Sequence, residues 1–151
     1  MIEKEELPGI VPHRGRMLLL SRITGYNLEE RSIEAEYHVT EDCLFYDTAE
    51  MGVPAWAGFE FIAQAVAAFS GLKDKGKGHT PKIGFVLSVS RLQMDIPFFK
   101  AGSILTIRAK ETGNMYPVYV FEGEIFLDSK KVLEGKITIM EVDNENERRF
   151  N

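Results

Sequence analysis

The sequence predicts an α+β domain in which a curved antiparallel β-sheet wraps around one long central helix. Three observations support this class: residues before position 41 alternate between apolar and polar side chains, residues 54–71 form one nearly apolar alanine-rich stretch, and further alternating segments follow it. A helix that is apolar on most of its faces must be buried. The strands predicted before and after it in the sequence can form the sheet that buries it.

The composition bounds the class of protein. The 151 residues, 44% of them hydrophobic, suit a single domain over residues 1–151. A net charge of −5 with scattered Lys and Arg argues against nucleic-acid binding. Cys43 is the only cysteine, which excludes an intrachain disulfide and a cysteine-based zinc site. The charged N-terminus lacks the apolar core of a signal peptide, so we expect a cytoplasmic protein, and we assign no metal and no cofactor.

The residues before the helix are predicted as two strands and a loop. Residues 2–10 suggest a short helical turn, and residues 17–23 a buried strand followed by a turn at 25–27. Residues 32–40 alternate apolar and polar side chains, which predicts a strand with one dry face. Residues 41–53 show neither period and are predicted as an irregular loop leading to the helix.

The central stretch is predicted as a buried helix that begins at Pro54 and ends at Ser70-Gly71. At 1.5 Å per residue it is about 27 Å long, which is short for a membrane span, and it carries a carboxylate. Glu60 and Gln64 lie four residues apart and therefore project from the same side. One stripe of small and aromatic side chains is expected to pack in the core: Trp56, Phe59, Ala63, Val66 and Ala67.

The second half of the chain is predicted as mostly β-structure. Residues 72–80 form a solvated connection, and residues 82–95 are rich in β-branched residues and predict a long central strand. After a turn at 97–102, three strands at 103–111, 118–127 and 132–142 close an antiparallel meander. The charged residues 143–151 are expected to be a frayed tail.

Three stretches resemble a known family. Residues 11–23 contain Pro-His-Arg ahead of a strand, residues 53–65 contain Pro, Glu and Ala-Gln at family spacing, and residues 85–102 end in Pro-Phe-Phe-Lys-Ala-Gly. In this order they resemble the 3-hydroxyacyl-acyl-carrier-protein dehydratases of the hotdog fold. The Pro-Ala-Trp start of the helix is most similar to the dehydratase-like proteins encoded in aryl-polyene biosynthesis clusters. The resemblance implies a hotdog fold and a homodimer that acts on thioesters of acyl carrier protein or coenzyme A.

The resemblance also implies a set of site residues. Dehydration of a 3-hydroxyacyl thioester needs a base for the proton beside the carbonyl, an acid for the departing hydroxyl, and donors for the thioester oxygen. Glu60 matches the family's helix acid, and its apolar neighbours favour a protonated carboxyl. The family's loop histidine is missing, and its equivalent falls near Tyr46 or Asp47. His13 and Asp47 are the candidate bases. Substrate binding is assigned to four residues: Gln64, Tyr46, Ala55 and Trp56.

Other interpretations of the same residues stay open. A hotdog thioesterase uses a helix carboxylate and needs no such histidine, and a non-catalytic acyl-binding subunit would keep the fold alone. Glu60 also suits an ion pair or solvent contact, and Gln64 an orienting hydrogen bond to the backbone or to Glu60. His38 and His79 are expected in solvent, and Cys43 as a small buried side chain.

Overall fold

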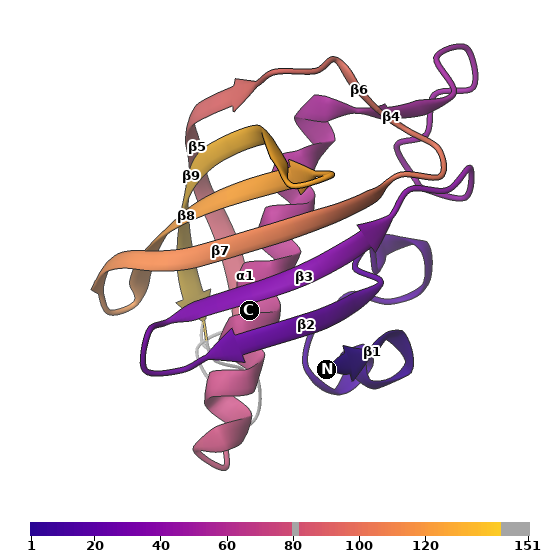
Figure 1. Ribbon diagram of the computed structural model, residues 1–151. Coiled ribbons are helices and arrows are strands. Elements are labelled where there is room, and N and C mark those ends of the chain that lie inside the picture. The colour runs from indigo at the N-terminus through magenta and orange to yellow at the C-terminus, as the bar shows by residue number, and fades with distance from the viewer. Residues whose placement is uncertain (80–81, 143–151) are drawn as a thin grey trace, which may run out of the picture.

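A seven-stranded antiparallel sheet curves around one long helix in the computed structural model, which describes residues 1–79 and 82–142 (Figure 1). The strands are ordered β1-β2-β3-β7-β8-β9-β5, and β4 and β6 form a separate two-stranded ribbon. The elements are β1 Ile2–Glu3, β2 Arg22–Asn27, β3 Ser32–His38, β4 Gly52–Pro54, α1 Gly58–Gly76, β5 Ile83–Met94, β6 Phe98–Lys100, β7 Ile104–Met115, β8 Val118–Leu127 and β9 Lys130–Val142. This arrangement confirms the predicted α+β class.

Helix α1 packs one apolar side against the concave face of the sheet. The large side chains on that side are fully buried: Phe61, Ile62, Phe69 and, across from them, Phe99 and Phe121. Gly123 on β8 lies directly under the helix, where a Cβ atom would overlap the side chain of Ile62. Helix and sheet therefore approach closely. The segment Ala55–Gly76 is also long and apolar enough to cross a membrane by composition, but 67% of its apolar window is buried inside the protein, as expected of a core helix.

The predicted end of the helix at Gly71 is wrong. A 3₁₀ turn at Ala55–Ala57 leads into α1, which continues to Gly76 and includes residues 72–76 of the predicted connection. Gly71 sits inside the helix because the backbone of Ile10 packs on it, so that a Cβ atom there would overlap the Ile10 carbonyl oxygen. This glycine is required for a close contact between segments and does not terminate the helix.

The first predicted strand is displaced along the chain. The structure begins β2 at Arg22, and the residues of the predicted turn at 25–27 lie inside that strand; the turn follows at residues 28–31. The displacement has a physical cause. The backbone of Met17 and Leu19 hydrogen bonds to the side chain of Gln64 on α1, so this part of the chain pairs with the helix and not with the sheet.

Strand β5 is an edge strand, which corrects the prediction of a central one. Among the described residues it pairs only with β9, and its side chains Phe85, Val86 and Leu87 are exposed. An apolar, β-branched segment has the same composition whether its neighbours come from its own chain or from outside, so composition could not distinguish the two positions.

The remaining strands follow the prediction closely. Strand β8 has the predicted bounds, β3 and β9 differ from theirs by a few residues, and β7 extends beyond its predicted end to Met115. Strands β7, β8 and β9 form the expected antiparallel meander. The predicted loop at 41–53 ends in β4, and the turn at 97–102 contains β6. The predicted frayed tail lies outside the described residues.

Candidate functional site

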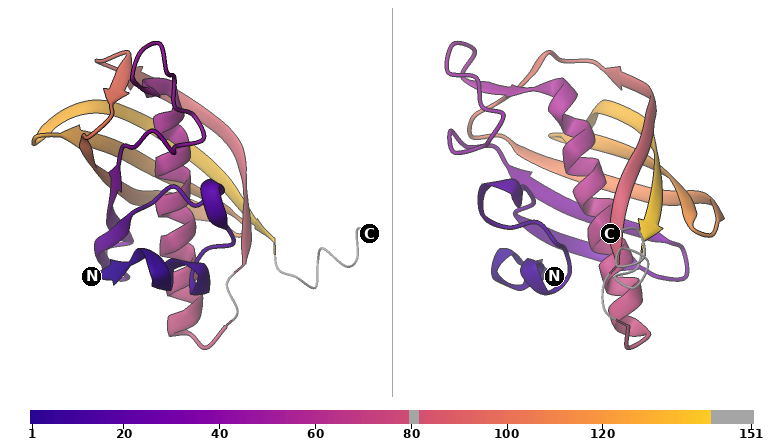
Figure 2. Two further views of the ribbon diagram at one scale, coloured as in Figure 1. Left: turned by 90° about the vertical axis from the view of Figure 1, so that its right-hand side faces the viewer. Right: turned by 180° about the vertical axis from the view of Figure 1, so that it is seen from behind.

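One side of α1 is covered neither by the sheet nor by the other residues that the structure describes. Figure 2 shows the helix in front of the sheet when the protein is seen from behind, with the N-terminal segment on one side of it and β5 on the other. The half-buried or exposed helix residues recur at three- and four-residue spacing: Trp56, Phe59, Glu60, Ala63 and Ala67. We call this set the open face of α1. It corrects the predicted core stripe, of which only Val66 is buried.

Glu60 lies on the open face, and its surroundings change the pKa of its carboxyl. Burial raises the pKa of its carboxyl above the ordinary value, and no charged or hydrogen-bonding neighbour contributes to that shift. Desolvation favours the neutral form of a carboxyl, which is the form that donates a proton. The position therefore provides an acid beside an apolar surface.

The raised pKa of Glu60 has a consequence for stability. A carboxyl whose pKa is higher in the folded protein binds its proton more tightly there, so its contribution to stability is present at acidic pH and is lost as the pH rises through the raised pKa. We expect Glu60→Gln, which keeps the shape without the charge, to raise the thermal unfolding midpoint at mildly alkaline pH and to change it little at acidic pH. Calorimetry at the two pH values would test this, and an equal effect at both would contradict it.

Gln64, one turn after Glu60, is fully buried and forms two hydrogen bonds with distant backbone. Its Nε2 donates to the carbonyl of Met17 at 2.6 Å, and its Oε1 accepts from the N–H of Leu19 at 2.8 Å. The interpretation of Gln64 as a backbone-orienting residue fits these bonds. They engage both ends of its amide and leave little of it for a substrate.

His13 lies in the segment that Gln64 holds. Along the chain it stands between Ile10, which contacts Gly71 of α1, and Met17, which bonds Gln64. Its Nδ1 is buried without a hydrogen-bond partner among the described residues. Burial, and secondarily the neighbouring Arg14, lower the pKa of the imidazole, which favours the neutral, proton-accepting form. Among the described residues His13 and Glu60 form no hydrogen bond with each other.

Tyr46 and Asp47 lie in the loop before the helix, where the carboxylate of Asp47 has a structural task. Its Oδ1 accepts hydrogen bonds from the N–H groups of Ala49 and Glu50 at 2.9 and 3.1 Å, and its backbone pairs with Gly52. Such bonds are typical of an Asx turn. Tyr46 is half-buried and packs against the core.

Ala55 and Trp56, the two predicted N–H donors to a thioester oxygen at the start of the helix, have different surroundings. The N–H of Ala55 already donates to the carbonyl of Pro97 at 2.9 Å. Trp56 lies in the first turn, where N–H groups lack acceptors within the helix, and its side chain is 51% exposed and meets the edge of the Phe45 ring. Of the two, Trp56 is the better candidate to meet a thioester oxygen.

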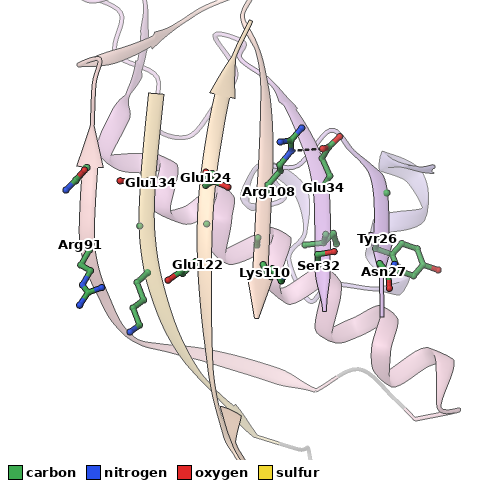
Figure 3. A pocket seen from close by; sticks show the side chains of 17 residues that line it. Tyr26, Asn27, Ser32, Glu34, Arg91, Arg108, Lys110, Glu122, Glu124 and Glu134 are labelled. Atoms are coloured by element: carbon green, nitrogen blue, oxygen red, sulfur yellow. Dashed lines mark hydrogen bonds and ion pairs between the residues drawn. The ribbon is translucent and has the colours of Figure 1, made fainter. Parts of the chain in front are cut away.

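A hollow of about 840 Å³ lies on the other face of the sheet and contains none of the predicted site residues (Figure 3). Four bases and four acids line it: Arg91, Arg108, Lys110, Lys136, Glu34, Glu122, Glu124 and Glu134. Arg108 on β7 and Glu34 on β3 form an ion pair there at 2.8 Å. The balanced charges are typical of the solvated outer face of a sheet.

The comparison with protein families decides the class of this chain. The family model described as ApeP dehydratase, of the ApeP-like group, matches residues 6–150. The chain belongs to the ApeP-like dehydratase family. This ApeP-like chain is 28% identical over 151 residues to the 3-hydroxyacyl-[acyl-carrier-protein] dehydratase FabZ of Wolinella succinogenes, with 96% of this chain and 99% of the relative covered. It is 29% identical over 150 residues to FabZ of Campylobacter fetus, with 95% and 99% covered.

Solved structures agree with the fold of the ApeP-like chain. A chain of the dehydratase heterocomplex ApeI:P from Xenorhabdus doucetiae superposes with a TM-score of 0.86 at 21% identity and covers 95% of each chain. The PaaI protein of the E. coli phenylacetic acid degradation operon gives a TM-score of 0.59 at 17% identity, covering 78% of this chain and 80% of that one. The predicted hotdog fold and dehydratase family are therefore confirmed, and the chain is a 3-hydroxyacyl-acyl-carrier-protein dehydratase-like protein.

Proposed function

We propose that this chain dehydrates 3-hydroxyacyl thioesters of acyl carrier protein in the cytoplasm, in fatty-acid or polyene biosynthesis, with Glu60 as the general acid. One observation carries the assignment of the acid. Glu60 is the carboxyl on the open face of α1 whose pKa is raised by burial alone, in a chain of the dehydratase family. A protonated carboxyl beside an apolar surface suits donation to a leaving hydroxyl.

The reaction breaks two bonds and forms one double bond. A base removes the proton beside the thioester carbonyl, the C–O bond to the hydroxyl breaks, and Glu60 gives its proton to the departing oxygen, which leaves as water. The product is the 2-enoyl thioester. The base then returns its proton to Glu60 through solvent, which restores the site. Donors near Trp56 stabilise the charge on the thioester oxygen in the enolate-like intermediate.

The base remains to be assigned among three groups. His13 is supported by its lowered pKa, which favours the proton-accepting form, and by a buried Nδ1 that has no hydrogen-bond partner among the described residues. Asp47 keeps one oxygen in its turn, which leaves the other oxygen for proton transfer. The third candidate is a histidine from a second subunit next to the open face, since hotdog dehydratases resembling this chain place acid and histidine on different subunits.

We also propose that the open face of α1 and the edge of β5 are covered by a second hotdog subunit, as in a homodimer. Strand β5 presents unpaired backbone and three exposed apolar side chains, and such an edge is an aggregation hazard unless it is paired. A second copy is the simplest partner. A related, histidine-bearing subunit is the alternative suggested by the Xenorhabdus complex, which is named a heterocomplex.

A pair of matched substitutions tests this interface. Leu87 on β5 and Ile104 on β7 are each 52% exposed. Because a buried unpaired charge is costly, Leu87→Glu should convert the dimer to monomers, whereas Ile104→Glu should leave it intact. Sedimentation velocity, with and without a candidate partner subunit, would measure this. Equal effects of the two substitutions would argue against β5 as the interface.

The proposed activity is tested by offering the protein 3-hydroxyacyl and saturated acyl thioesters on carrier protein while following both enoyl product and free thiol. Enoyl product supports dehydration. Thiol release would instead support a thioesterase, and tight binding without turnover a non-catalytic acyl-binding subunit. His13→Asn and Asp47→Asn assign the base, and the second of these keeps an oxygen for the turn. If neither substitution reduces dehydration, the base comes from another subunit.

A further inference from the structure

The segment from Ile10 to Leu20, which we call the strap, is held on α1 at two places. At one end the carbonyl of Ile10 packs against Gly71, and at the other Gln64 bonds the backbone of Met17 and Leu19. The two helix positions are seven residues apart, so the strap runs along about 10 Å of α1. Since the earlier strap residue meets the later helix residue, the strap runs antiparallel to the helix.

The strap is stiffened between its two anchors. The guanidinium of Arg14 donates to three carbonyls of its own neighbourhood, those of Pro8, Val11 and His13, at 2.7 to 2.8 Å. Arg16 donates to the carbonyl of Asp42 at 3.3 Å and so connects the strap to the loop before the helix. The strap is therefore a bent segment braced by hydrogen bonds. Its position on the helix depends on the contacts at its two ends.

The Gln64 end of the strap lies beside the turn that carries Glu60. Side chains on a helix tilt toward its N-terminus, so the amide of Gln64 lies over the preceding turn. Met17, whose carbonyl takes the shorter bond from Gln64, has a side chain that is 61% exposed although its neighbours Leu18 and Leu19 are buried. An exposed methionine whose backbone is bonded to the helix one turn from Glu60 suits contact with a flexible apolar ligand.

We propose that Gln64 is a positioning residue, which clamps the strap so that its Met17 end forms one wall of the acyl-thioester site beside Glu60. This inference rests on the proposed function for the identity of the ligand. Gln64 makes no contact with substrate in this account, because its amide is buried and bonded at both ends. It acts through Met17 by fixing the width of the site.

Two substitutions of Gln64 separate this role from simple stability. Gln64→Met has a similar length and loses both hydrogen bonds. Gln64→Glu keeps the acceptor for Leu19 and, when protonated, also a donor for Met17. Ile137→Val is the matched control, since it removes one buried methylene from β9, a strand that takes no part in the strap. All variants are made in the complete assembly, including a partner subunit if one is needed for turnover.

Three readouts are followed on each variant. Hydrogen–deuterium exchange reports the strap. Trp56, the single tryptophan, reports binding of decyl-pantetheine, a thioether that neither dehydrates nor hydrolyses. Turnover of 3-hydroxydecanoyl carrier protein gives kcat and KM.

We expect Gln64→Met to increase exchange in residues 10–20 and to weaken both probe binding and kcat/KM by about tenfold or more. Gln64→Glu should recover binding at acidic pH, and Ile137→Val should stay close to wild type in all three readouts. Unchanged exchange in Gln64→Met would show that Gln64 does not hold the strap in place. Raised exchange with unchanged probe binding would show that the strap does not form a wall of the site. If the wild type binds the probe as expected but shows no turnover, the proposed activity fails while this inference stands.

Discussion

We expect Glu60→Gln to lower the proposed dehydration activity by about 10²- to 10⁴-fold in kcat, because an amide has the shape of the carboxyl but cannot give a proton to the leaving hydroxyl. The fold should be retained, since the substitution removes a carboxyl for which burial disfavours the charge. Steady-state measurement of enoyl product at saturating substrate gives kcat directly. In the wild type, kcat/KM should fall as the pH rises through the raised pKa of Glu60, because the general acid must be protonated.

The control for this loss is Glu50→Gln. Glu50 is an exposed residue in the loop before the helix, so its replacement makes the same carboxyl-to-amide change without entering the open face. It should leave kcat close to wild type. A Glu60→Gln protein that retains wild-type kcat would show that the acid lies elsewhere.

We expect Gly71→Ala to destabilise the protein by about 1–3 kcal/mol, although the same change within a helix ordinarily stabilises by about 1 kcal/mol. The sign reverses because a Cβ atom at this position would overlap the carbonyl oxygen of Ile10, which is backbone and cannot rotate away. The strap would have to leave the helix. Urea unfolding measures the free energy of unfolding for both proteins.

Gly76→Ala is the matched control in the last turn of the same helix. A Cβ atom there would lie 3.8 Å from a side-chain carbon of Leu28, which is an ordinary contact. We expect this variant to be as stable as wild type or more so. If Gly71→Ala behaves as Gly76→Ala does, the strap is not packed on the helix as described.

Alternation of apolar and polar residues in the sequence predicted the strands that pair regularly within the sheet. Strand β3 alternates Ile33, Ala35 and Tyr37 inward, and these side chains are buried as the pattern indicates. Strand β8 has its predicted bounds, residues 118–127. The position of Glu60 on the helix followed from its match to a known helix acid, and its raised pKa followed from the apolar side chains around it.

The errors occurred where a contact distant in sequence overrides a local signal. In the sequence, Gly71 is typical of a helix end. In the structure, the carbonyl of Ile10 occupies the space that a side chain at this position would need. Met17 to Leu20 resemble a strand, but their backbone pairs with Gln64, 45 and 47 residues away. Neither contact has a signature in the local sequence.

The helix stripe and β5 were misplaced for a related reason. Trp56, Phe59, Ala63 and Ala67 are spaced as a core stripe, and β5 has the composition of a central strand, yet both are open in the single chain. An apolar pattern predicts burial without saying which chain provides the cover. Their shared exposure on neighbouring elements is the basis for proposing a second subunit.

The most direct test of the central claim is mass spectrometry of 3-hydroxyacyl carrier protein after incubation with the assembled protein. The account predicts a carrier-bound enoyl chain, lighter by one water, that forms with wild type and not with Glu60→Gln. Free carrier thiol, or enoyl product formed equally well by Glu60→Gln, would contradict it.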